Sequence, residues 1–519
     1  MQRTSQSNVR SRLFDLLLLI STPVLAIDAD LLWVKQLGGS LGTANPNGMA
    51  LDSQGNIYCV GDFTGTVDFD PGTGTEIANA TNLNSFVSKF EPSGNLSWVK
   101  IFGSSSTIQT YSVTVDLDGN VYVVGAFAGA VDFDPGPGTT ILTSTGSFNI
   151  FILKLEASGF LLWAKQISGN DTAVAQAVAV DDGSVYLCGR FSGTSDFDPG
   201  LGSNNFTAIG QEDTFVLKLD ESGNTLWARQ IGGTGQDTSL SLALDSNENV
   251  YLTGYFSDTA DFDPGPDTIF ISPFGQIDAF VVKLDVGGQL IWAKHFGANT
   301  NIAVGNSISL DADDSVYVAG YFEISADFNP GPDTTILNSA GSNDIFVVKL
   351  EDSGNFSWAR QMGGADADIP LDISIDSHGN VFTCGFFRGS ADFDPGPDTN
   401  VLTALDATDI FVSKLDSMGE LVWNAHIGGS EGEQASSVIV DDSGVIHALG
   451  LFQGTVDFDP GADINSLSAL GDFDAFVMSF SVSDTDSETL PVSSELLFVV
   501  ILIIGIRAII VAKWNRRLN

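Results

Sequence analysis

Short apolar runs, separated by Gly, Asn, Asp and Ser, recur along most of the chain in groups of four. One group comprises residues 239–244, 250–256, 279–284 and 290–294, and it is rich in β-branched and aromatic residues. Runs of this length and composition, bounded by turn residues, are typical of β-strands. Each group is therefore predicted to form a unit of four strands.

The groups repeat with a nearly constant period, which is marked by a Trp in the last strand of each group. The seven residues are Trp33, Trp98, Trp163, Trp227, Trp292, Trp358 and Trp423. Subtraction gives separations of 65, 65, 64, 65, 66 and 65 residues. A four-stranded unit cannot bury its faces alone, whereas a ring of such units supplies a continuous core. The sequence therefore predicts an all-β fold, a seven-bladed β-propeller.

The two ends of the repeat region complement each other. Residues 31–37 form a Trp-containing strand that precedes all other strands of the repeats, and the last unit ends at 475–480 without such a strand. We expect the N-terminal strand to complete the last blade, because this removes two exposed sheet edges. The closed propeller is predicted to span residues 27–482.

Each unit also contains the motif Asp-Phe-Asp-Pro-Gly between its second and third strands. The copies begin at Asp68, Asp132, Asp196, Asp261, Asp327, Asp392 and Asp457. In the copy that begins at Asp327, Asn329 replaces the second Asp. Because strand direction alternates within a blade, all seven copies are expected on one face of the ring.

Two interpretations of this motif are open. In the first, Asp caps a turn, Pro and Gly set the backbone, Phe packs between blades and one Asp pairs with a strand Lys. In the second, the clustered oxygens bind Ca²⁺, which prefers six to eight oxygen ligands. The candidate calcium ligands are Asp261, Asp263, Asp267, Asp392, Asp394, Asp398, Asp457, Asp459 and Asp463.

The complete repeat follows a pattern that covers roughly residues 31–480 in seven copies. It reads Val-Asp-x-x-Gly-Asn-Val-Tyr-Val-x-Gly-x-Phe, then Asp-Phe-Asp-Pro-Gly, then Asp-x-Phe-Val-x-Lys-Leu-Asp-x-x-Gly-x-Leu-x-Trp-Ala-Lys. This pattern resembles the bacterial β-propeller repeat family known as SBBP repeats. The resemblance implies a seven-bladed propeller of an exported or surface protein, and it implies no particular reaction or ligand.

Charge narrows the choice of partner. The chain has 21 Lys and Arg against 65 Asp and Glu, a formal net charge of −44. This balance argues against nucleic acid or an anionic lipid surface, and it favours cations or basic partners. A hydrophobic content of 43% is too high for a disordered acidic chain. The acidic residues are therefore expected on a folded body.

Motifs that would indicate catalysis are absent from the sequence. The four His residues have no metal-ligand spacing, and Cys59, Cys188 and Cys384 occupy one equivalent position in three separate units. A binding or scaffold module is therefore favoured, and the alternative is a hydrolase or lyase with a site in the central channel. Uniform channel-facing residues on the first strands would favour the scaffold, whereas polar and asymmetric ones would favour the enzyme.

Both ends of the chain differ from the repeats. Residues 1–26 show the basic, apolar and small-residue order of a secretory signal peptide, with an uncleaved N-terminal anchor as the alternative. Residues 483–495 form an acidic linker, 496–512 a predicted transmembrane helix, and 513–519 a basic tail expected in the cytoplasm. This order resembles the C-terminal sorting tails of bacterial surface proteins, although it departs from the Leu-Pro-x-Thr-Gly and Pro-Glu-Pro patterns.

Together these features predict an exported propeller that is anchored by one C-terminal helix at the bacterial cell envelope. It is expected to act as a monomeric binding or scaffold module for a protein or glycan of the envelope. Calcium is a candidate stabilising ion.

Overall fold

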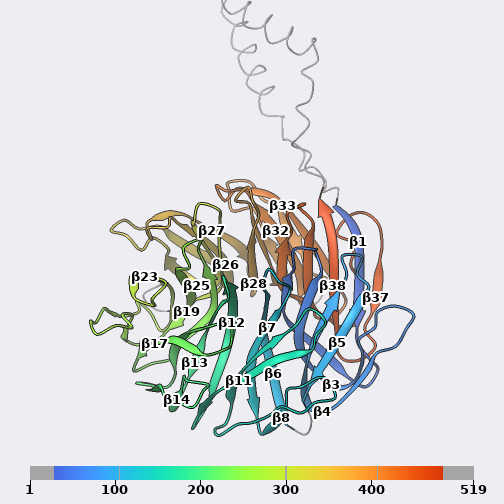
Figure 1. Ribbon diagram of the computed structural model, residues 1–519. Helices are drawn as coiled ribbons and strands as arrows, with labels where there is room; N and C mark the ends of the chain where they lie inside the picture. Colours follow the sequence, from blue (N-terminus) through green and yellow to red (C-terminus); the bar gives the residue numbers. More distant parts are fainter. Residues whose placement is uncertain (1–28, 104–105, 298–300, 406, 483–519) are drawn as a thin grey trace, which may run out of the picture. The chain divides into compact units, whose positions relative to one another are not determined.

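The computed structural model describes residues 29–103, 106–297, 301–405 and 407–482, and these residues form an all-β body (Figure 1). Within these ranges every regular element is a β-strand, and no helix is long and apolar enough to cross a membrane. The predicted signal peptide (1–26), linker (483–495), transmembrane helix (496–512) and basic tail (513–519) lie outside the described residues.

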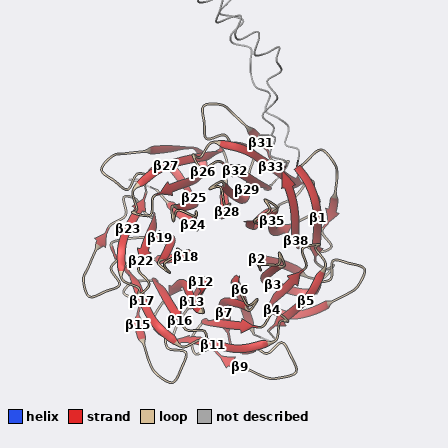
Figure 2. Ribbon diagram, turned by 45° about the horizontal axis from the view of Figure 1, so that its top comes forward, coloured by secondary structure: helices blue, strands red, loops and turns tan. Residues whose placement is uncertain are grey.

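Seven blades of four antiparallel strands surround a central channel (Figure 2), so the predicted seven-bladed propeller is confirmed. We name the strands of a blade A to D from the channel outward. In that order, blade 1 consists of β2 (Thr43–Leu51), β3 (Ile57–Asp68), β4 (Ile77–Phe90) and β5 (Leu96–Phe102); blade 2 of β6 (Thr107–Val115), β7 (Val121–Ala128), β10 (Asn149–Leu155) and β11 (Leu161–Gly169); and blade 3 of β12 (Ala173–Asp181), β13 (Ser184–Phe191), β16 (Asp213–Leu219) and β17 (Thr225–Gly233). Blade 4 consists of β18 (Asp237–Leu244), β19 (Val250–Phe256), β22 (Asp278–Leu284) and β23 (Leu290–Phe296), and blade 5 of β24 (Ala303–Leu310), β25 (Val316–Asp327), β26 (Ile336–Leu350) and β27 (Phe356–Gly364). Blade 6 consists of β28 (Ile369–Ile375), β29 (Val381–Phe387), β32 (Asp409–Leu415) and β33 (Leu421–Gly429), and blade 7 of β34 (Gln434–Val440), β35 (Ile446–Phe452), β38 (Asp474–Val482) and β1 (Ala29–Leu37).

The N-terminal strand closes the ring, as the sequence predicts. Strand β1 is the D strand of blade 7 and lies beside β38, so the first and last described strands share one sheet (Figure 2). This pairing covers the edge of β38, which would otherwise expose unpaired backbone groups. The ring therefore depends on residues from both ends of the repeat region.

The hydrophobic core lies between neighbouring blades. Side chains of β7, β10 and β11 pack against those of β12, β13 and β16 in one buried cluster, and similar clusters lie along the ring. The B and C strands are nearly continuous runs of buried residues because each is covered on both faces by adjacent blades. No blade could bury these faces alone.

Short turns connect A to B and C to D on one face of the ring, which we call the turn face. In the A–B turn of blade 2, Asp116 Oδ1 accepts the N–H groups of Asp118 at 3.1 Å and Asn120 at 2.8 Å. Gly119 has a φ of 82°, a conformation that favours glycine. The Asp-x-x-Gly-Asn part of the repeat therefore encodes this turn.

The B–C and D–A connections lie on the opposite face, which we call the loop face. Five of the B–C connections contain a small hairpin: β8 (Ala130–Asp132) with β9 (Ile141–Thr143), β14 (Thr194–Asp196) with β15 (Asn205–Thr207), β20 (Ala260–Asp261) with β21 (Phe270–Ile271), β30 (Ser390–Asp392) with β31 (Val401–Thr403), and β36 (Thr455–Asp457) with β37 (Ser466–Ser468). In the other two blades, the long B and C strands continue into the connection. Strand β20 also pairs with the end of β17, the D strand of the preceding blade. The loops with the Asp-Phe-Asp-Pro-Gly motif therefore link adjacent blades.

The repeated Trp also joins neighbouring blades. The indole Nε1 of Trp292 donates a hydrogen bond to the carbonyl oxygen of Asp352, in the C–D turn of the next blade, at 3.0 Å. Equivalent bonds are made by Trp33, Trp98, Trp163, Trp227 and Trp358. The strict period of the Trp thus reflects a contact that each of these blades makes with the next.

Candidate functional site

The candidate calcium loops are built as capped turns. Asp261 Oδ1 accepts the N–H groups of Asp263 at 3.1 Å and Ile269 at 2.8 Å, and Asp263 Oδ1 accepts that of Gly265 at 2.7 Å. The same bonds are made by Asp392, Asp394, Asp457 and Asp459. The third candidate of each loop is exposed: Asp267, Asp398 and Asp463. The Asp pair of each loop therefore has a clear role in the backbone turn.

Calcium binding at these nine aspartates would need more oxygens than the capped turns use. The turn bonds use one oxygen, Oδ1, of each capping carboxylate. In the described part of the chain, no three His, Cys, Asp or Glu side chains gather into a group that could hold a metal ion. Calcium binding at the loops therefore stays a prediction.

The Phe of the motif packs between blades, as the structural interpretation expects. Phe262 is buried and makes edge contacts with Phe256 and Phe280, with ring centroids 5.0 Å and 5.5 Å apart. It belongs to a core cluster that also contains Ile231 of the preceding blade. The motif thus contributes directly to cohesion of the ring.

The predicted pairing between a loop Asp and a strand Lys is wrong. The lysines of the C strands form ion pairs with acidic residues of the short turns, on the opposite face of the ring. The pairs are Lys89–Asp52, Lys154–Glu221, Lys218–Glu248, Lys283–Asp245, Lys283–Asp352 and Lys349–Asp311. The long lysine side chain follows its strand toward the A–B turn, where the nearly buried carboxylates of Asp52, Asp245 and Asp311 need a counter-charge.

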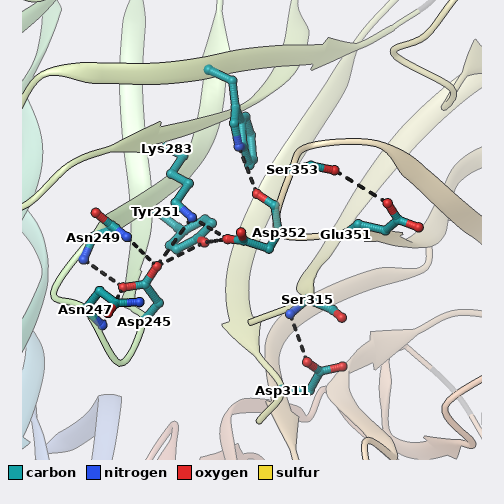
Figure 3. A network of polar contacts seen from close by, with 11 residues as sticks. Asp245, Asn247, Asn249, Tyr251, Lys283, Asp311, Ser315, Glu351, Asp352 and Ser353 are labelled. Atoms are coloured by element: carbon teal, nitrogen blue, oxygen red, sulfur yellow. Dashed lines mark hydrogen bonds and ion pairs between the residues drawn. The ribbon is translucent and has the colours of Figure 1, made fainter. Parts of the chain in front are cut away.

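Figure 3 shows this turn-face network between blades 4 and 5. Lys283 Nζ lies 3.4 Å from Asp245 Oδ2 and also pairs with Asp352 of the next blade. Burial raises the pKa of Asp245, but hydrogen bonds from Asn249 and Asn247 and the charge of Lys283 outweigh it and hold the pKa below its ordinary value. The Tyr251 hydroxyl donates to Asp352 Oδ1 at 2.6 Å. These groups satisfy one another, which indicates a structural role.

The channel is lined by the A strands of all seven blades and encloses a cavity of about 190 Å³. Each A strand contains a β-bulge, and the bulged residues differ from blade to blade: Asn47, Tyr111, Gln176, Leu240, Asn306, Leu371 and Ser436. The next residue is small in every blade except blade 6, where it is Asp372. The lining is therefore neither uniform nor wholly asymmetric.

The polar groups of the channel connect blades to one another. Asp372 accepts hydrogen bonds from the Ser307 and Ser437 hydroxyls, both at 2.8 Å, and from the Val438 N–H at 3.0 Å. Burial raises the pKa of Asp372 despite these bonds. Among the described lining residues Asp372 supplies the one carboxyl group, and no His or Cys accompanies it. A hydrolase or lyase in the channel would have a single acid that is already bonded on both oxygens.

The blades differ more at the loop-face end of strand B, where the repeat reads Gly-x-Phe. The variable residues are Asp62, Ala126, Arg190, Tyr255, Tyr321, Phe386 and Leu451. The Phe that follows is buried in every blade. In blades 4 to 7 the variable residue is large, apolar or aromatic, and partly exposed. The Phe of Gly-x-Phe is therefore constant, whereas the residue before it varies among the blades.

A pocket of about 570 Å³ opens on the loop face at blade 7, where blades 6, 7 and 1 meet. We call it the blade 7 pocket. Phe386, Leu451 and Phe473 form its apolar part, and Phe473 is 36% exposed. The amides of Asn45, Gln434 and Gln453 supply neutral polar groups, and Arg388, Glu431 and Glu433 are the ionisable residues of the lining. A concave apolar site with a few convergent polar groups is the usual form of a ligand site.

Two buried carboxyl groups lie beneath the blade 7 pocket. Glu433 and Asp409 are almost fully buried, and the pKa of Glu433 is raised to about 8 by burial and then by the charge of Asp409. Asp409 also bonds the ring of His426. Asp409 Oδ1 and Glu433 Oε1 have no hydrogen-bond partner among the described atoms. With a pKa of about 8, the carboxyl group of Glu433 is largely protonated at pH 7, so Glu433 itself adds little charge to the pocket.

Similar acid pairs occur at two other blade junctions. Asp213 lies near Asp237, and Asp344 lies near Asp368. Burial is the largest cause that raises the pKa of Asp237 and of Asp368 to about 7, and the charges of Asp213 and Asp344, respectively, also raise it. The recurrence favours a structural role for the pairs. At blade 7 a pair of this kind also borders an open pocket.

Comparison with known proteins places the chain in a repeat class. The family model described as "Beta-propeller repeat" (SBBP) matches residues 32–65, 97–126 and 226–255. Each matched segment runs from a D strand across the following A and B strands, in register with the blades seen here. This is a β-propeller repeat protein. The resemblance that the sequence suggests is confirmed for the repeat and its fold.

Relatives of this β-propeller repeat protein are distant and longer. The chain is 23% identical over 467 residues to "Uncharacterized WD repeat-containing protein L264" of Acanthamoeba polyphaga mimivirus, which covers 74% of the chain and 33% of the relative. It is 28% identical over 225 residues to "Regulatory protein FlaEY" of Caulobacter vibrioides, covering 42% and 22% respectively. The chain therefore spans about a third or less of the length of these curated relatives.

Solved structures show only general likeness. A chain in the crystal structure of the mitotic checkpoint complex is 10% identical with a TM-score of 0.42, over 88% of this chain and 94% of that chain. Sqt1 from Chaetomium thermophilum is also 10% identical, with a TM-score of 0.40 over 88% and 100%. The function of the β-propeller repeat protein has to be argued from its own surface.

Reasoning from the repeat motif missed the blade 7 pocket. The repeated loop motif consists of residues that every blade needs for its turn, whereas the pocket is lined by residues that differ between blades. The variable position in Gly-x-Phe, occupied by Phe386 and Leu451 at the pocket, is the signal that could have indicated it. The complete lining also requires the closed ring, because Asn45 and Gln434 meet only there.

Proposed function

We propose that this protein is an exported binding module, anchored at the bacterial cell envelope, whose ligand site is the blade 7 pocket. The observation that carries the proposal is the contrast within the ring at this site. Framework positions such as the buried Phe of Gly-x-Phe are kept in all blades, while the residues around the pocket are particular to blades 6, 7 and 1. A site built from such residues can recognise one ligand on an otherwise regular scaffold.

Retention of envelope components by immobilised protein tests the binding site. Wild-type protein and a Phe386→Ala variant are compared with a matched control, Tyr255→Ala, which changes the equivalent residue of blade 4 outside the pocket. We expect a component that is retained by wild type and by Tyr255→Ala and lost with Phe386→Ala. Equal retention by all three proteins would contradict the pocket as the site. Parallel runs with calcium and with EDTA show whether retention depends on the ion.

Export and anchoring rest on the segments at residues 1–26 and 496–512, and they need a separate test. If the basic residues at 513–519 stay in the cytoplasm, the propeller faces outward. Protease added to intact spheroplasts should then digest the propeller. Full protection from the protease would contradict this topology.

A further inference from the structure

The blade 7 pocket has a size and a composition that narrow the class of its ligand. Its volume of about 570 Å³ falls within the range of small-molecule sites. Partly exposed Phe386 and Leu451 contribute apolar surface, and Phe473 adds a second aromatic ring. A flat ligand with one apolar face could pack against this surface.

Two amides of the pocket have free hydrogen-bonding capacity. Gln434 and Gln453 are partly buried, and within the described part of the chain their side-chain amides make no hydrogen bond. Each amide offers both donors and an acceptor. Such groups match hydroxyl groups, which also donate and accept, and leaving them unpaired beneath a ligand would weaken binding. The pocket is therefore suited to a ligand with several hydroxyls.

The charges of the pocket do not favour an ionic ligand. Exposed Arg388 and Glu431 have opposite signs, and the raised pKa of Glu433 leaves its carboxyl group largely uncharged at pH 7. The chain as a whole carries a formal charge of −44, which repels polyanions. An isolated cation would find only Glu431 as an accessible counter-charge, with Arg388 in the same lining.

We infer that the blade 7 pocket binds an uncharged saccharide of one or two rings, which packs an apolar face on the Phe386 side and bonds its hydroxyls to the amides of Gln434 and Gln453. This inference rests on the proposed function, because it names the ligand class of that same site. The competing ligand is an apolar peptide side chain, which would use the aromatic surface and leave the amides unpaired.

The test uses purified full-length protein with glucose, galactose, N-acetylglucosamine and their β-1,4-linked disaccharides cellobiose, lactose and chitobiose as probes. Binding is detected by saturation-transfer-difference NMR and measured by calorimetry. We expect at least one probe to bind wild type and Tyr255→Ala with equal affinity. Phe386→Ala and Gln453→Ala should each weaken that affinity by about tenfold or more, since each removes a contact to the sugar. Unchanged melting temperatures would show that the variants are folded.

The possible failures have different meanings. If no probe binds, or if binding survives both pocket substitutions, the saccharide inference is overturned. If Phe386→Ala still abolishes retention of a peptide component from envelope extract while Gln453→Ala does not, the pocket remains the ligand site and the ligand is a peptide. If Phe386→Ala affects neither sugar binding nor retention, both the inference and the proposed function fall.

Discussion

The turn face and the loop face of this propeller are built from the same seven repeats but differ in what is repeated. On the turn face, C-strand lysines pair with turn carboxylates and the blade Trp bonds to the next turn, blade after blade. On the loop face, the residue after the strand-B Gly varies around the ring, and at blade 7 such variable residues line a pocket.

This difference separates cohesion from recognition. A contact that each blade makes with the next must repeat, because the closed ring needs a stable interface between every pair of neighbouring blades. A ligand site gains nothing from repetition if one ligand binds once. Constant polar groups in a repeat protein are therefore expected at junctions, and residues that break the repeat are the better guide to a site.

The largest expected effect tests the shared framework itself. A chain that begins at Gly38 lacks β1, leaves the edge of β38 unpaired and removes Leu37 from a core cluster. We expect this chain to aggregate or to lose its cooperative melting transition. A chain that begins at Ala29 is the matched control. Wild-type melting of the shorter chain would show that β1 is dispensable and that closure has been misassigned.

The next effect compares one cation from each face. Lys283→Met on the turn face leaves Asp245, whose side chain is 1% exposed, without its counter-charge. We expect a loss of about 3 kcal/mol in the free energy of unfolding, measured with urea. Arg388→Met on the loop face changes an exposed side chain, and a change within about 0.5 kcal/mol is expected. Equal losses for both variants would remove the distinction between the faces.

The acid pairs predict a smaller effect that depends on pH. Burial, with the charges of Asp213 and Asp258, raises the pKa of Asp237 to about 7 from an ordinary value of 3.8. The native state therefore holds a proton that the unfolded state has lost, so this contribution to stability decreases as pH rises from about 4 to 7. Asp237→Asn cannot ionise, and it should be more stable than wild type at pH 8, on the order of 2 kcal/mol, with no difference near pH 4.

A matched control for the acid pair lies one junction further along the ring. Asp278 occupies the position of Asp213, but Ala303 stands where the second acid, Asp237, would be. Asp278→Asn therefore serves as the reference for removing a carboxyl group at a junction without an acid pair, and we expect the gain at pH 8 only for Asp237→Asn. Melting temperatures of both variants across pH 4 to 8 would decide the matter, and a parallel pH response of the two would contradict a raised pKa for Asp237 in its pair.

Calcium has the smallest expected effect, because the loop carboxylates already cap their turns. If the loop aspartates bind Ca²⁺, EDTA should lower the melting temperature by about 2–4 °C, and calcium should restore it. Sodium chloride at matched ionic strength only screens charge and should restore less. A melting temperature that is insensitive to EDTA, or equal rescue by sodium, would leave the motif as a turn alone.

The strands could be predicted because their signals are local. The predicted run 250–256 coincides with β19, and 279–284 and 290–294 fall within β22 and β23. Closure of the ring by residues 31–37 could be predicted because the repeat region begins with one extra Trp-containing strand and ends one strand short. Apolar period, turn residues and the Trp spacing are all visible within about one unit of sequence.

Contacts between blades could not be predicted in the same way. Lys283 and Asp352 are 69 residues apart, and only the ring shows that they meet on the turn face. The strand lysines pair with the turn that their strand approaches, and not with the Asp-Phe-Asp-Pro-Gly motif for which a lysine partner is predicted. The blade 7 pocket combines Asn45 with Gln434, which closure alone brings together.

The central claim is that the propeller recognises its ligand at blade 7 and uses the other blades as scaffold. The most direct measurement places a photo-crosslinking benzophenone residue at Arg388, in the pocket lining, or at Ser192, the equivalent position of blade 3, and irradiates cells that produce the protein. We predict a defined adduct mass at position 388 and none at position 192. Equal adducts at both positions, or an adduct at position 192 alone, would contradict the claim.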